Sequence, residues 1–157
     1  MLLHNVVMTF WIKEISWKRV TLATLIFGVI SFVIRQIEAI LTMKYYFMPQ
    51  YFGVWSKLMM PVAGPPPASF MITSFIFTLI TGVSVSLIYY YLKDHLPKET
   101  HKRIFYFADL MIGTSFVFFT LPTYLMFNVP VGLLVSWFIS SFIILTLGSW
   151  VMVKIIK

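Results

Sequence analysis

An apolar stretch of this 157-residue chain contains three polar residues that could carry chemistry. The stretch covers residues 20–48, VTLATLIFGVISFVIRQIEAILTMKYYFM, and includes Arg35, Gln36 and Glu38. On a helix Arg35 and Glu38 are three positions apart, so they share a face and can form an ion pair. A charge at the centre of a bilayer costs about 3 kcal/mol, so such residues usually face other helices or a cavity. We therefore expect either a structural ion pair that holds the segment after residue 43, or a polar binding pocket.

A second candidate is Asp109, in the apolar stretch 104–127. At a rise of about 1.5 Å per residue, Arg35 lies about 22 Å from Val20, whereas Asp109 lies about 8 Å from Ile104. We expect the two polar sites to lie near opposite faces of a membrane. One site therefore cannot readily use both.

The other residue types exclude several kinds of chemistry. The absence of cysteine excludes disulfides, thiolate metal sites and CxxC redox pairs. The three histidines lie outside the apolar stretches, which excludes a bis-histidine haem or a Glu-x-x-His di-iron site within a helix bundle. No Walker A, GxSxG or HExxH motif is present. Methionines near residues 43–60 are more often packing residues than copper ligands. We therefore expect no cofactor, no metal and no enzymatic activity.

Composition places the chain in the membrane class. Hydrophobic residues make up 60% of it and the mean hydropathy is +0.91, whereas soluble domains are about 45–50% apolar. The formal charge of +7 comes from basic residues in the links and ends between apolar runs. This distribution is typical of membrane topology signals, and we expect a lipid bilayer rather than a nucleic acid as the partner.

We predict an all-α, single-domain protein over residues 1–157, with spans at about 20–43, 68–92, 104–127 and 131–153. Helices of 23 to 25 residues reach roughly 35 Å, enough to cross a hydrocarbon core of about 30 Å. Residues 1–19 place apolar side chains on one stripe, which predicts an N-terminal helix lying in the membrane interface.

Prolines and short links define how these spans connect. Three prolines, residues 65–67, precede the second span, and Pro122 predicts a kink in the third. Only residues 128–130 separate the third and fourth spans, so these two helices must be antiparallel neighbours. The longest link, residues 44–67, is rich in aromatic residues. We expect it to lie at the lipid headgroups or to fold over the helices as a cap.

Small residues recur every four positions in the second span, at Ser74, Thr78, Gly82 and Ser86. A stripe of this kind lets two membrane helices approach closely, and it predicts a helix-packing face.

Basic residues predict the orientation of the chain. One side of the predicted membrane would carry Lys13, Lys18, Arg19, Lys93, Lys98, Lys102, Arg103, Lys154 and Lys157, and the other only Lys44 and Lys57. This bias of nine against two predicts a multi-pass protein with cytoplasmic N- and C-termini.

Two functions fit these features. The first is a non-catalytic subunit or interaction protein that packs laterally, as a homo-oligomer or within a larger membrane complex. The alternative is an oligomeric transporter or channel for a small solute or ion, with Arg35, Gln36 and Glu38 lining an outward-facing pocket.

The orientation can be measured with single cysteines, because the chain has none of its own. We expect Gln50→Cys to react with a membrane-impermeant maleimide added outside intact cells, and Lys98→Cys to react only after the cells are permeabilised. Labelling of Lys98→Cys in intact cells would reverse the predicted orientation.

Overall fold

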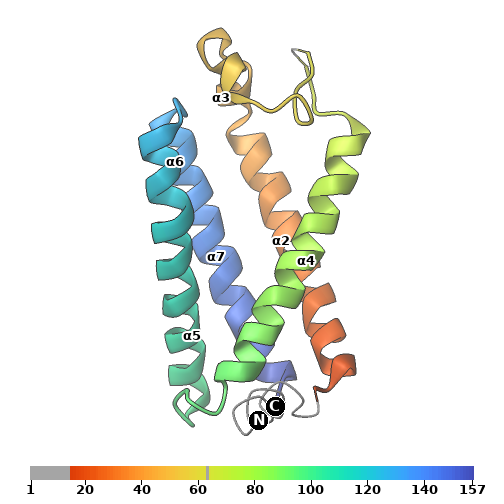
Figure 1. Ribbon diagram of the computed structural model, residues 1–157, viewed down its shortest axis with the longest axis vertical. Helices are drawn as coiled ribbons and strands as arrows, with labels where there is room; N and C mark the ends of the chain where they lie inside the picture. Colours follow the sequence, from red (N-terminus) through yellow and green to blue (C-terminus); the bar gives the residue numbers. More distant parts are fainter. Residues whose placement is uncertain (1–14, 63) are drawn as a thin grey trace, which may run out of the picture.

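The computed structural model describes residues 15–62 and 64–157, where every regular element is helical (Figure 1). The spans are α2 (Trp17–Leu41), α4 (Ala68–Leu92), a continuous run of α5 (Thr100–Ser115), η2 (Phe116–Thr120) and α6 (Leu121–Met126), and α7 (Val131–Ile155). All four are long and apolar enough to cross a membrane. Over the described residues, the prediction of an all-helical fold with four helices of this length and apolar character is therefore confirmed. The predicted interfacial helix falls mostly outside the described residues, and Trp17 already begins α2.

The ends of the spans follow local sequence signals. Helix α4 begins directly after Pro67, because the backbone of Pro67 is extended and lies outside the helical conformation. The helix ends before Lys93, as predicted. The third span begins at Thr100, four residues before its predicted start, because the basic residues 102 and 103 form part of its first turn. Helix α7 continues two residues beyond its predicted end, to Ile155.

The third span changes its hydrogen-bonding pattern just before Pro122. Residues Phe116–Thr120 form a π-helical segment, in which the amide of Leu121 donates to the carbonyl of Phe116, five residues back. Proline lacks an amide hydrogen and its ring collides with the carbonyl four residues earlier, so a regular α-helix would be strained there. The wider π turn accommodates the proline and keeps the span helical.

The four spans pack in the order α4, α2, α7, α5 (Figure 1). Helix α2 packs against α4 and α7, and α7 also packs against α5. All of the spans approach one another at the end where α2 begins and α7 finishes, whereas α4 leans away at the opposite end. The buried core lies mainly at the convergent end and comprises Val20, Ala23, Phe27, Val85, Tyr89, Ile104, Phe107, Ile144, Val151, Met152, Val153 and Ile156.

Phe27 of α2 connects three helices because glycines leave room for its ring. A Cβ atom at Gly148 of α7 would lie 2.6 Å from Cδ2 of Phe27, and one at Gly82 of α4 would lie 3.2 Å from Cδ1. Phe27 is only 1% exposed. The two glycines therefore allow α4 and α7 to pack on opposite edges of one buried aromatic ring.

The small-residue stripe of α4 contributes to packing along only part of its length. Gly82 and Ser86 are buried against α2, where the hydroxyls of Ser86 and Thr24 lie 3.3 Å apart. Ser74 is exposed, and Thr78 is half-buried with its hydroxyl bonded to the carbonyl of Ser74. The C-terminal half of the stripe, Gly82 and Ser86, therefore packs against α2.

The segment between α2 and α4 contains two short helices, α3 (Met43–Tyr46) and η1 (Pro49–Val54). It lies above the end of α2 in Figure 1. Tyr45 contacts Gly132 in the first turn of α7 so closely that any side chain at Gly132 would displace the tyrosine hydroxyl. This contact attaches the segment to α7.

We expect Gly82→Leu to destabilise the protein by about 2 kcal/mol, because the added side chain meets the backbone carbonyl and side chain of Thr24. The measurement is thermal unfolding in mild detergent. The matched control is Thr81→Leu, since Thr81 is the exposed neighbour of Gly82 on the same helix. Equal unfolding temperatures for the two variants would show that the close approach at Gly82 is unimportant.

Candidate functional site

A cluster of polar side chains joins α2 to α7 near the end where the helices diverge. We call it the α2–α7 polar cluster, and its members are Arg35, Glu38, Thr42, Ser136, Ser140 and Ser141. Positions 35, 38 and 42 recur every three or four residues, so they share one face of α2. Positions 136 and 140 have the same relation on α7. Two helical faces therefore supply all of its side chains.

Arg35 donates two hydrogen bonds to α7. Its Nη1 lies 2.7 Å from Oγ of Ser140, and its Nη2 lies 2.8 Å from Oγ of Ser141. The Ser140 hydroxyl in turn donates to the backbone carbonyl of Trp137 at 3.0 Å. A planar guanidinium suits this arrangement, because it presents two N–H groups side by side. Arg35 therefore spans two adjacent serines.

Glu38 is 7% exposed, and one oxygen of its carboxylate accepts two hydrogen bonds. Oε1 accepts hydrogen bonds from Ser136 of α7 and from Thr42 of its own helix, each at 3.0 Å. The Thr42 hydroxyl also lies 2.8 Å from the backbone carbonyl of Glu38. A buried carboxylate requires such donors, since burying an unsatisfied charge is very unfavourable.

The direct ion pair expected between Arg35 and Glu38 is absent, although both residues are described. The two side chains instead bind different serines of α7, because hydroxyls of the neighbouring helix lie within reach of each. Arg35 and Glu38 therefore join α2 to α7, and not α2 to the segment after residue 43. Gln36 is half-buried and takes no part in the cluster.

Aromatic side chains cover the cluster on the side of α3. Nε1 of Trp137 donates to the hydroxyl of Tyr46 at 3.1 Å, and the ring of Trp55 packs against both residues. Burial raises the pKa of Tyr46, so its phenol remains protonated at neutral pH. Tyr46 thus meets the indole N–H as a neutral hydrogen-bond acceptor. These rings connect the capping segment to the cluster.

Asp109 of α5 is not a member of this cluster. It is exposed on α5, and it forms no hydrogen bond or ion pair with any of the described residues. The buried residues of the same helix are Ile104, Phe107 and Ala108. Asp109 therefore points to the surroundings of the molecule.

The partners of Arg35 could not be assigned from the sequence. Ser136 and Ser140 of α7 are four residues apart in an apolar helix, and this spacing indicates that they share a polar face. Their pairing with Arg35 and Glu38, however, depends on how two distant helices are rotated against each other.

The donors and acceptors of Arg35 and Glu38 are directed at α7, which suits the cluster to joining helices. In this cluster the Ser136 hydroxyl donates to the Glu38 carboxylate, and the Ser140 and Ser141 hydroxyls accept from Arg35. Comparisons with known proteins found no matching family model, no similar curated protein and no similar solved structure. The geometry of the chain is therefore the basis for assigning its function.

We expect Arg35→Met to destabilise the protein by about 3 kcal/mol, because Glu38 would remain as a buried charge without a nearby cation. The double variant Arg35→Met, Glu38→Leu should recover much of that loss, because it removes both charges. Thermal unfolding of purified variants measures both effects. Gln36→Leu is the control, since Gln36 lies beside the cluster without joining it. A double variant less stable than Arg35→Met would argue against a structural clamp.

Proposed function

We propose that this chain is an integral membrane protein with both termini in the cytoplasm, and that it acts as a non-catalytic subunit or interaction protein. It packs laterally against itself or against a larger membrane complex. Four helices of sufficient length and apolar character support insertion. The excess of basic residues at the end where α2 begins supports the orientation.

The observation that carries this proposal is the exposure of Asp109 on an apolar helix. Asp109 lies six residues beyond Arg103, or about 9 Å along α5, and large apolar side chains surround it on the same face. Its short side chain cannot extend to water as far as a lysine can. An aspartate facing lipid at this depth is unfavourable by up to about 3 kcal/mol. Contact with a second protein surface would relieve this cost by supplying a hydrogen-bond donor or a cation.

Gly113, one turn beyond Asp109, supports a protein partner at this face. Apart from its chain neighbours and the backbone of its own helix, no heavy atom of the described residues lies within 4 Å of the position a Cβ would take there, so a second helix can approach the backbone closely. Phe105 and Tyr106 are each 61% exposed on the preceding turn and offer aromatic contact area. The face that we call the Asp109 face, formed by Phe105, Tyr106, Asp109 and Gly113, combines these features.

The α2–α7 polar cluster favours the same function over transport. A solute site needs polar groups that are free to bind the solute, whereas Arg35 and Glu38 already bind serines of α7. A transporter whose Arg35 and Glu38 exchange these bonds for a solute is the alternative. It would show itself as uptake that disappears in the double variant while folding is preserved.

We expect Asp109→Leu to weaken lateral assembly about tenfold while leaving the unfolding temperature of the isolated chain unchanged, since Asp109 has no partner within the described residues. The measurement is cross-linking of the tagged protein in membranes, followed by purification in mild detergent. Identification of the captured chains distinguishes a homo-oligomer from a larger complex.

The matched control is Glu99→Leu, which removes an exposed carboxylate from the start of the same span. It should leave assembly intact. Unchanged assembly of Asp109→Leu would contradict the proposal that this face binds a protein.

A further inference from the structure

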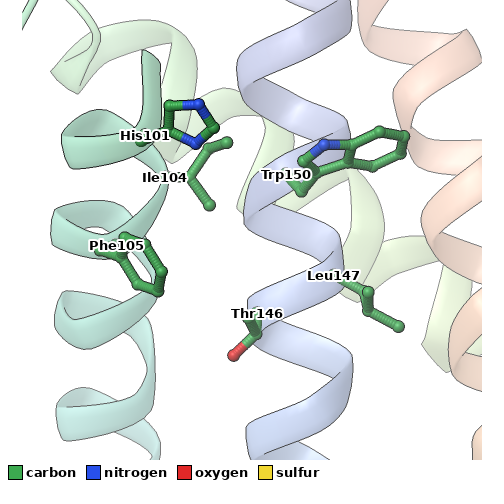
Figure 2. A pocket seen from close by; sticks show the side chains of 6 residues that line it. All are labelled: His101, Ile104, Phe105, Thr146, Leu147 and Trp150. Atoms are coloured by element: carbon green, nitrogen blue, oxygen red, sulfur yellow. The ribbon is translucent and has the colours of Figure 1, made fainter. Parts of the chain in front are cut away.

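A groove of about 370 Å³ lies between α5 and α7, at the opposite end of the molecule from the α2–α7 polar cluster. Figure 2 shows the six residues that line it, which are His101, Ile104, Phe105, Thr146, Leu147 and Trp150. His101 and Trp150 lie at similar heights at one end of the groove, with the indole ring extending away from His101, and Phe105 and Thr146 lie further along it. The groove therefore runs along the helices, with an imidazole and an indole at its mouth.

The interior of the groove offers almost no hydrogen bonds. Ile104 is buried and forms part of its wall, while Phe105 and Leu147 present apolar surface. The only hydroxyl, that of Thr146, already donates to the carbonyl of Phe142 at 2.8 Å. A ligand in this groove must therefore be a hydrocarbon over the part that lies against these side chains.

The mouth of the groove opens towards the most basic end of the molecule. The described residues there include eight cations, Lys18, Arg19, Lys93, Lys98, Lys102, Arg103, Lys154 and Lys157, and two carboxylates, Asp94 and Glu99. Lys154 follows Trp150 by one turn of α7, and it forms no hydrogen bond or ion pair with the described residues. Lys102, by contrast, is paired with Glu99 at 3.0 Å. Lys154 is therefore a cation available to a ligand that leaves the groove.

We propose that this groove binds one acyl chain of an anionic phospholipid, with the phosphate held at the mouth by Lys154 and His101. This inference rests on the membrane insertion proposed above, and the groove shares only Phe105 with the Asp109 face, so the variants that test it leave Asp109, Tyr106 and Gly113 unchanged. An apolar channel leading to cations matches a molecule with a hydrocarbon chain and an anionic headgroup. Trp150 is 51% exposed at the same end of the groove, where its indole N–H can donate to the ester or phosphate oxygens.

Native mass spectrometry can test the proposal on the delipidated full-length protein, mixed with equal amounts of phosphatidylglycerol and phosphatidylcholine. We expect one retained lipid per chain, with phosphatidylglycerol favoured at least about fivefold, the factor expected for one lysine at a membrane surface. Equal retention of the two lipids by the unaltered protein would overturn the proposal. A shift of oligomeric state without lipid retention would also overturn it, because a second copy would then fill the groove.

Two variants separate the acyl chain from the headgroup. Thr146→Phe fills the groove and should abolish retention of either lipid, whereas Thr114→Phe should not. Thr114 is the matched control because its hydroxyl makes the same bond, to a carbonyl four residues back on an exposed helical face. Normal lipid retention by Thr146→Phe would contradict the assigned groove.

The double variant Lys154→Gln, His101→Gln should retain a lipid but lose the preference for phosphatidylglycerol. It leaves the groove open, so it tests the headgroup contact even if Thr146→Phe fails to fold. Lys44→Gln, at the opposite end of the molecule, is its control and should keep the full preference. An unchanged preference in the double variant would show that these two residues do not bind the headgroup.

Discussion

The contact between α2 and α7 holds this molecule together, because α4 packs mainly on α2 and α5 packs mainly on α7. Its two halves use different physical interactions. Near the convergent end, the ring of Phe27 packs against the bare backbone of Gly148, so the contact depends on shape and dispersion. Near the other end, Arg35 and Glu38 bind serines through directional hydrogen bonds. Close packing brings the helices together, and the polar bonds fix how they are rotated.

The close packing at the convergent end explains why the buried core is concentrated there. Small residues are placed where α2 and α4 cross, at Gly28 and Gly82, so the two backbones approach there. Beyond the crossing, large side chains such as Ile72 and Phe77 point outwards from α4. In water such a surface would be unfavourable, whereas against lipid it replaces one hydrocarbon contact with another. The splayed arrangement of α4 is therefore compatible with the proposed membrane location.

Local signals in the sequence were sufficient to predict the spans, and the contacts between them were not predictable. The bounds of α4 were correct because prolines precede it and Lys93 follows it. The start of α5 was placed too late because hydropathy ends at the charged residues, although these form its first turn. The depth of Arg35 and Asp109 followed from counting residues. Their surroundings depend on helix rotation, which is why Arg35 bonds to α7 and Asp109 is exposed.

The π-helical segment before Pro122 divides the third span into two halves with different angular phase. A turn that holds about one extra residue shifts every later side chain around the axis by roughly 100°, compared with an uninterrupted α-helix. A stripe that begins at Asp109 therefore does not continue straight into Leu121–Met126. The two halves of this span present separate surfaces to their surroundings, so α6 can contact a different neighbour from the one that meets α5.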